Sequence, residues 1–290
     1  MKLIDLLQDS ILNRKISEKI AGDLLKISSE QLFLRKKNLA ISPAVCKKFK
    51  KAEKAIVERG LPYQYAVGKS WFYGREFIVN KDVLIPRIET ELLVQKALSF
   101  LHDRIKNLEL GIRNKKITII DVGTGTGCLA VSLYKESRKF MIRNSQFTIQ
   151  LYATDISEKA LSVARKNSKI HKTKIIFLKS DLLDNPKLPQ KFDLVLANLP
   201  YLPSADIIPE NSIYNEPKIA LNGGKDGLDL IEKLIRDLPN RLAKNGLAIL
   251  EIDPRQKTEI GEYTKKYQLK TIFRNDLNNR TRFAMLENKR

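Results

Sequence analysis

From residue 117 onward the sequence alternates short apolar runs with amphipathic segments, and this alternation limits the fold more than any other feature. The apolar runs predict strands at 117–121, 147–153, 174–178, 192–197, 246–252, 267–273 and 282–286. Helices are predicted after Gly127, from Asp155 to about Ser168, and over 227–242. Strands interleaved with helices form a mostly parallel sheet that is covered on both faces. The last two strands lie too close for a crossover connection, so they are predicted to be antiparallel.

Polar residues lie at the ends of four of these predicted strands: Asp121, Asp155, Asp181 and Asn198. Open α/β sheets bind their ligands at the carboxyl ends of the strands. The four side chains are therefore expected to share one edge of the sheet and to form a binding site there.

The segment "DVGTGTG", from Asp121 to Gly127, places three glycines between a strand and a helix. Glycine tolerates close backbone approach, so a ligand can lie against the turn; a plain tight turn and a dinucleotide site are the alternatives. A dinucleotide motif has its third glycine one residue later. The negative charge of Asp121 would also repel a pyrophosphate. The segment favours a cationic nucleoside, S-adenosylmethionine. Its predicted binding residues here are Asp121, Gly123, Thr124, Gly125, Thr126 and Gly127.

The acids after the next two strands are predicted to hold the nucleoside part. Asp155, in "ATDIS", can accept hydrogen bonds from both ribose hydroxyls, and helix capping is the alternative role. Asp181 is placed to accept a hydrogen bond from the adenine amino group, while Leu182 packs on the base. An ordinary loop acid is the alternative at Asp181.

The segment "DLVLANLPY" ends a buried strand in an amide, a proline and an aromatic ring. The Asn198 side-chain oxygen and the Leu199 carbonyl can accept both hydrogens of a substrate NH₂ group, and Asn198 is also expected to contact the cofactor. Pro200 fixes the direction of the loop, and Tyr201 can cover the flat group. An amide nitrogen is a poor nucleophile, so alignment with a methyl donor is the main help available. The pattern predicts nitrogen methylation, with a strand-ending turn as the alternative.

The first part of the chain has a different pattern. Residues 1–66 place apolar residues at helical spacing and predict a small helical domain. Substrate recognition is its expected role because of its position before the hairpin. Ser42 and Pro43 predict the start of one helix, and Gly60 predicts its end. Aromatic runs around Gly74 predict a β-hairpin linker over 67–86. The methyltransferase domain is then expected to occupy 87–290.

Composition sets broader bounds. The chain has 53 Lys and Arg against 33 Asp and Glu, a formal net charge of +20. This charge fits either nucleic-acid contact or a compositional bias, and direct nucleic-acid binding is not required. Cys46 and Cys128 lack metal-ligand spacing, so neither a metal site nor a disulfide framework is expected. Asp5 interrupts any signal peptide and no apolar run reaches membrane-spanning length, so a cytoplasmic location is expected. A monomer is a separate expectation.

These motifs together resemble those of the HemK/PrmC family, the release-factor glutamine N5-methyltransferases, over nearly the whole chain. The matching segments are "PYQYAVG", "WFYGREFIVNKDVLIPRIETE", "DVGTGTGCLA", "ATDIS", "SDLL", "ANLPY" and "NEPKIALNGGKDGLDL". The Asn-x-Pro-Tyr element alone is shared with DNA adenine and RNA guanine methyltransferases. The flanking segments are far more specific.

The resemblance implies a Rossmann-like class I methyltransferase fold behind a helical domain. It implies methylation of the glutamine in the Gly-Gly-Gln motif of class-1 peptide release factors. The implied substrate-binding residues are Asn198, Leu199, Pro200, Tyr201, Arg87 and Glu89. The implied catalytic residues among them are Asn198, Pro200 and Tyr201.

Two positions depart from the family pattern, because Leu199 and Ile88 stand where proline is usual. At position 199 the backbone carbonyl is the expected functional group, so activity is expected to survive. Three alternatives stay open at this stage: methylation of a ribosomal-protein glutamine, methylation of a nucleic-acid amino group, and a non-catalytic binding module that retains a cofactor fold.

Overall fold

A seven-stranded sheet forms the centre of the structure, a computed structural model that describes residues 1–108, 115–141, 147–207 and 215–289. Its strands are β3 (Lys115–Val122), β4 (Phe147–Asp155), β5 (Ile175–Lys179), β6 (Phe192–Ala197), β7 (Leu242–Glu251), β8 (Leu269–Asn275) and β9 (Thr281–Asn288). They lie in the order β5-β4-β3-β6-β7-β9-β8. The first five are parallel, and β9 is antiparallel to both of its neighbours. The predicted fold class is therefore confirmed, including the antiparallel pair at the end.

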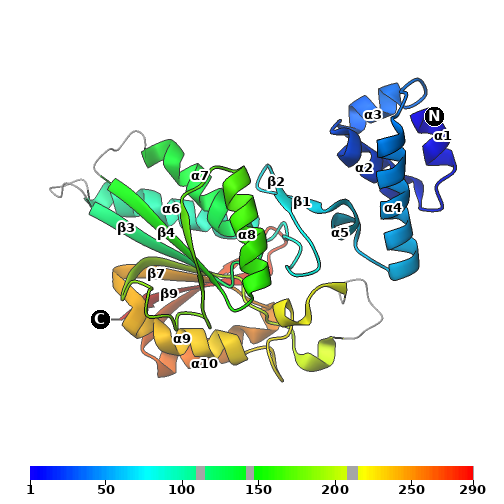
Figure 1. The fold of residues 1–290 in the computed structure, drawn as a ribbon. Coiled ribbons are helices and arrows are strands. Elements are labelled where there is room, and N and C mark those ends of the chain that lie inside the picture. Colours follow the sequence, from blue (N-terminus) through cyan, green and yellow to red (C-terminus); the bar gives the residue numbers. More distant parts are fainter. Residues whose placement is uncertain (109–114, 142–146, 208–214, 290) are drawn as a thin grey trace.

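Helices cover both faces of this sheet (Figure 1). On one face lie α6 (Glu91–Leu108), α7 (Cys128–Met141) and α8 (Glu158–Ile170); on the other lie α9 (Asp229–Arg241) and α10 (Lys257–Lys266). Side chains alternate between the two apolar clusters along β3: Ile117 and Ile119 belong to one, and Ile120 and Val122 to the other. This period of two is the reason that the strand is apolar throughout.

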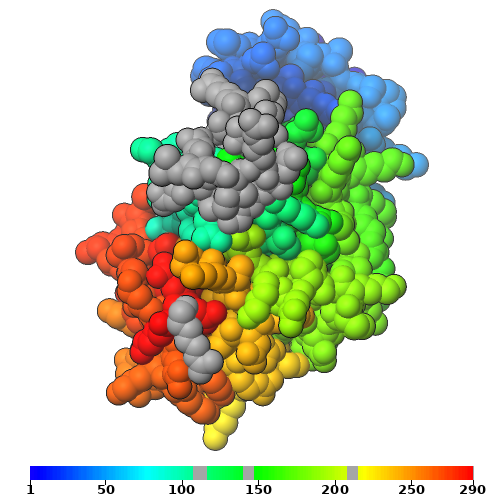
Figure 2. Space-filling view, turned by 90° about the vertical axis from the view of Figure 1, so that its left-hand side faces the viewer, coloured from blue at the N-terminus to red at the C-terminus, as the bar shows by residue number. Residues whose placement is uncertain are grey.

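Five short helices come before the sheet: α1 (Leu3–Gln8), α2 (Arg14–Leu25), α3 (Ser29–Arg35), α4 (Pro43–Arg59) and α5 (Tyr63–Val67). They pack around their own apolar cluster, which includes Leu6, Ile20 and Phe49. Helix α4 has the predicted ends, since the Ser42 hydroxyl accepts a hydrogen bond from the Val45 amide and Gly60 is left-handed. In Figure 2 these helices, in blue, lie at one end of the molecule, far from the red C-terminal strand.

The predicted hairpin consists of β1 (Lys69–Phe72) and β2 (Arg75–Ile78), paired antiparallel. Tyr73 and Gly74 both have positive φ, which is the backbone that a tight hairpin turn with matching twist requires. Phe72 and Phe77 are buried in the cluster beneath α6 and α7. The Asn167 amide on α8 also pairs with both backbone groups of Ile78, so the hairpin is fixed to the sheet domain.

Three 3₁₀ turns complete the described elements: η1 (Ser204–Asp206), η3 (Lys218–Ala220) and η4 (Pro254–Gln256). Cys46 and Cys128 are both free. Within the described ranges, none of the helices has the length and apolar character needed to cross a membrane. The same residues contain no group of three or more His, Cys, Asp or Glu side chains that could hold a metal ion.

Candidate active site

A cavity of ≈ 520 Å³ lies at the carboxyl ends of the parallel strands, within the range of small-molecule sites. Its lining includes these predicted site residues: Arg87, Asp121, Gly123, Thr124, Gly125, Thr126, Asp155, Asp181, Leu182, Asn198, Leu199 and Pro200. Three other predicted residues, Gly127, Tyr201 and Glu89, lie outside the lining. The structure therefore brings the four polar strand ends to one cavity.

The glycine loop joins β3 to α7, with Gly123, Gly125 and Gly127 all at positive φ. A Cβ atom on Gly123 would lie 2.9 Å from the Leu199 Cδ2 atom, which is closer than real Cβ contacts come. The loop after β3 therefore lies against the loop after β6, and the positive φ of Gly123 favours glycine at this contact. Gly127 faces away from the cavity and packs against Ala164 of α8.

Asp121 is the next-to-last residue of β3, and its carboxylate is buried, with 2% of the residue exposed. Its Oδ2 atom accepts a 2.6 Å hydrogen bond from the Thr124 hydroxyl. Burial raises the pKa of Asp121 to about 7, and the Thr124 hydrogen bond opposes that shift. A buried carboxylate with this pKa lacks a cationic partner, so the site is suited to a positively charged ligand group.

Asp155 is the last residue of β4, and its carboxylate binds backbone amides of two loops, the glycine loop and the loop before α8. One carboxylate oxygen accepts a 2.9 Å hydrogen bond from the Gly125 amide, and the other accepts a 2.9 Å bond from the Ser157 amide. The cap of α8 is Ser157 itself, whose hydroxyl accepts from the Ala160 amide. Burial raises the pKa of Asp155. An ionised carboxylate has about four acceptor positions, so this group can still accept a hydrogen bond from a ligand.

The end of β5 supplies a different set of groups. Asp181 forms a 2.5 Å ion pair with Lys233, and its carboxylate still lines the cavity. Leu182 is buried at a φ of 53, a left-handed conformation that a branched residue rarely adopts. Ser180 also lines the cavity, whereas its hydroxyl oxygen is buried and has no hydrogen-bond partner in the described part of the chain.

Asn198 follows β6 directly, and a chain of hydrogen bonds holds its side chain. The Asn198 Nδ2 atom donates to the Thr90 hydroxyl at 2.9 Å. That hydroxyl donates to the Glu251 Oε2 atom at 2.8 Å. Thr90 and Glu251 were not predicted as site residues. The only sequence signal for Glu251 is its place as an acid at the end of an apolar strand.

The Glu251 carboxyl is 2% exposed, and burial raises its pKa to about 7. The Thr90 hydrogen bond and the positive charge of Arg282 lower this pKa, while the charge of Glu89 raises it. Glu89 therefore lies close to the network without lining the cavity. Burial, followed by the nearby charge of Glu251, raises the pKa of Tyr201 to about 12, so the phenol stays protonated.

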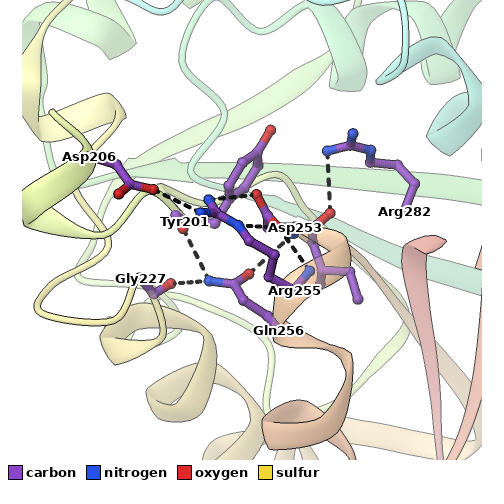
Figure 3. Close-up of polar contacts among 8 residues, drawn as sticks. Tyr201, Asp206, Gly227, Asp253, Arg255, Gln256 and Arg282 are labelled. Carbon is purple, nitrogen blue, oxygen red and sulfur yellow. Dashed lines mark hydrogen bonds and ion pairs between the residues drawn. The ribbon is translucent and has the colours of Figure 1, made fainter. Parts of the chain in front are cut away.

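Residues of η4 support the loop after β6 through polar contacts with its backbone (Figure 3). The Gln256 amide donates to the carbonyls of Tyr201 and Gly227, at 3.0 and 2.9 Å. A Cβ atom on Gly227 would lie 2.2 Å from the Tyr201 carbonyl oxygen, so this close contact needs glycine. Next to this contact, Arg255 forms ion pairs with Asp253 and Asp206, at 3.0 Å each. Tyr201 is thus fixed by its backbone.

Arg87 and Glu216 connect two segments that are far apart in sequence. The Glu216 carboxylate accepts hydrogen bonds from the Ile85 amide, at 2.8 Å, and from the Arg87 guanidinium. Glu216 is buried, so removal of Arg87 would leave an uncompensated charge there. Ile88, the next residue, is 76% exposed. Arg87 therefore shapes the cavity wall through its ion pair.

The donor and acceptor groups of the cavity fit S-adenosylmethionine. Asp121 offers a buried carboxylate for a cation, Asp155 offers acceptors for ribose hydroxyls, and Asp181 and Leu182 line the neighbouring part of the cavity.

Comparisons with known proteins agree with this site. A family described as "Methyltransferase domain" matches residues 113–275. The release factor glutamine methyltransferase of Bacillus cereus is 35% identical over 208 residues, which are 69% of this chain and 66% of that protein. That of Borreliella burgdorferi is 34% identical over 269 residues, 88% of this chain and 86% of that protein.

A solved structure of the hMettl16 catalytic domain with a MAT2A 3'UTR hairpin is also similar, with a TM-score of 0.52 at 14% identity. The match covers 86% of this chain and 82% of that one. At this identity it shows the fold alone.

Proposed function

The chain belongs to the release factor glutamine methyltransferase family, and from this premise we propose that it methylates the side-chain nitrogen of a release-factor glutamine. It is an S-adenosylmethionine-dependent methyltransferase by family and by fold. The finer proposal is that the acceptor is the glutamine of the Gly-Gly-Gln motif in class-1 release factors. The observation that supports it is the contact between Gly123 and Leu199, since it brings the loop after β6, which we propose to hold the amide, against the glycine loop.

When bound, S-adenosylmethionine supplies an electrophilic methyl group on a positively charged sulfur. We assign its cationic groups to Asp121, its ribose to Asp155 and its adenine to the region of Asp181 and Leu182. The raised pKa of Asp121 supports this assignment, since a nearby cation would favour the ionised carboxylate.

Asn198 and Leu199 orient the substrate in this proposal. The Asn198 Oδ1 atom and the Leu199 backbone carbonyl accept the two hydrogens of the glutamine NH₂ group. Both hydrogen bonds strengthen as the nitrogen becomes positive during transfer. Pro200 stiffens the loop that carries these acceptors.

The proton balance needs no strong base in the cavity. As the nitrogen–methyl bond forms and the sulfur–methyl bond breaks, the amide nitrogen becomes strongly acidic and gives one proton to water. Alignment is then the main contribution of the chain, and fixed acceptors at near-attack distance can supply it.

The proposal is tested with labelled S-adenosylmethionine, purified class-1 release factor and peptide mass spectrometry. We expect one added methyl group on the Gly-Gly-Gln glutamine. Ribosomal proteins and RNA are incubated in parallel. Label on those substrates, with none on the release factor, would replace the proposed substrate; cofactor binding without any transfer would favour a binding module.

We further propose that residues 1–66 recognise the body of the release factor. The Asn215 amide donates to the Gly60 carbonyl at 2.6 Å, which joins the end of α4 to a segment close to the cavity-lining residues Lys218 and Ile219. A short peptide with the Gly-Gly-Gln motif should therefore be a poorer substrate than the whole release factor. Equal kcat/KM for the two would contradict this role.

A further inference from the structure

We propose that Thr90 and Glu251 are positioning residues that fix the side-chain amide of Asn198 with its carbonyl oxygen toward the substrate. The inference rests on the proposed function, because it explains how Asn198 presents an acceptor to the glutamine NH₂ group. It concerns two residues that do not touch the reacting atoms.

The three residues come from three separate segments that meet at one edge of the sheet. Thr90 directly precedes α6, Asn198 follows β6, and Glu251 is the last residue of β7. Thr90 is 5% exposed and Glu251 is 2% exposed, so water does not compete for their hydrogen bonds. The Asn198 Oδ1 atom accepts no hydrogen bond within the described part of the chain.

The direction of the hydrogen bonds follows from counting donors. An ionised carboxylate only accepts, so the single hydrogen of the Thr90 hydroxyl goes to Glu251. The Thr90 oxygen can then only accept from Asn198, which must offer its NH₂ group. The amide oxygen of Asn198 is left to face the cavity. Without this constraint, the side chain of Asn198 could take either of two orientations in which its oxygen and nitrogen exchange places.

Protonation of Glu251 removes this constraint. A neutral carboxyl can donate to the Thr90 oxygen, and the Thr90 hydrogen can then go to the Asn198 oxygen, so that the amide flips. In that flip Asn198 would meet the substrate NH₂ group with its own NH₂ group. The charged and titratable groups that face Glu251 are Arg282, Arg87, Glu89 and the Tyr201 phenol. The pKa of Glu251, about 7, puts the change near neutral pH.

The first test measures methyl transfer to the release factor at saturating S-adenosylmethionine. Thr90→Val should lower kcat by roughly 10- to 100-fold through misorientation, with cofactor affinity within twofold of the wild type by calorimetry. Thr90→Ser keeps the hydroxyl and should restore most of the kcat. The matched control is Thr264→Val, which removes a buried hydroxyl on α10 that donates to the Gly261 carbonyl. Its kcat should be unchanged.

The second test is the pH profile of kcat, which does not depend on the folding of Thr90→Val. A group that ionises near pH 7 predicts about a tenfold rise in wild-type kcat from pH 6 to pH 8. Glu251→Gln keeps an acceptor and cannot ionise, so its profile should be flat over this range.

Two outcomes would overturn the inference alone: a folded Thr90→Val enzyme with wild-type kcat, or a pH profile in Glu251→Gln that still rises. By contrast, a wild-type enzyme that binds S-adenosylmethionine and leaves the release factor unmethylated would overturn the proposed function itself.

Discussion

The two halves of the cavity are built in different ways. In the cofactor half, the supporting hydrogen bonds join residues that are closer in sequence: Thr124 to Asp121, three residues apart, Gly125 to Asp155, 30 residues apart, and Lys233 to Asp181, 52 residues apart. In the substrate half, Asn198 is joined to Thr90 over 108 residues, and Thr90 to Glu251 over 161. The cofactor half therefore depends on local loop geometry, whereas the substrate half depends on the completed fold.

The largest effect on turnover is expected from Asn198→Ala, which removes a side chain from the substrate half of the cavity. Turnover should fall by roughly 100- to 1,000-fold, because an acceptor aimed at the developing charge is lost. Cofactor affinity, measured by calorimetry, should stay within a few-fold of the wild type. Asn240→Ala, an exposed position on α9, serves as the control. Equal losses of turnover and cofactor affinity would show that the two halves are not separable at Asn198.

The reverse pattern is expected for Asp121→Asn in the cofactor half. Loss of a charge-assisted contact should weaken S-adenosylmethionine binding by roughly 10- to 100-fold. In the wild type, cofactor affinity should also fall as the pH drops below the Asp121 pKa of about 7. Calorimetric titrations at pH 6 and pH 8 check this. A pH-independent affinity would mean that Asp121 does not face the ligand cation.

The same substitution should change stability in the opposite direction to affinity. The folded pKa of Asp121, about 7, lies above its unfolded value, so its favourable contribution is full below the unfolded pKa and is lost as the pH rises to 7. Asp121→Asn avoids this loss and should be more stable than the wild type at pH 8. Each pKa unit corresponds to about 1.4 kcal/mol, so a gain of a few kcal/mol is the upper bound. Urea unfolding at pH 5 and pH 8 measures it; a gain at pH 5 alone would contradict the sign.

A smaller effect is expected where the substrate loop is supported from behind. Gln256→Ala leaves the Tyr201 and Gly227 carbonyls without their donor and should lower the free energy of unfolding by about 1–3 kcal/mol. The KM for release factor should rise, while calorimetry should find cofactor affinity unchanged. A change in cofactor affinity with no change in KM would mean that Gln256 supports the cofactor half of the cavity instead.

The smallest effect is expected from Leu199→Pro, which introduces the residue that is usual in the family. The backbone carbonyl survives this change, so activity should stay within about tenfold of the wild type, which corresponds to about 1.4 kcal/mol in activation free energy. Leu199→Met is the control for packing against Gly123. A large loss in the proline variant alone would mean that the loop geometry differs from that of relatives with two prolines.

The same contrast explains what the sequence could predict. Each strand was predicted to within a few residues, because buried parallel strands are continuous apolar runs. The cavity was predictable at Asp121, Asp155 and Asn198, since strand ends of a parallel sheet share an edge. Thr90 and Gln256 were not, because their hydrogen bonds depend on how α6 and η4 pack against the sheet. No local pattern encodes those contacts.

The position of β9 has a consequence for the order in which the protein can be completed during synthesis. Strand β9 is made after β8 and yet lies between β7 and β8, so β8 has no partner in the sheet until β9 has left the ribosome. Phe283 of β9 is also the register partner of Glu251. A nascent chain that ends before Thr281 contains every residue of the cavity and still lacks the strand that aligns Glu251. We expect the enzyme to gain activity in one late step of its synthesis rather than domain by domain.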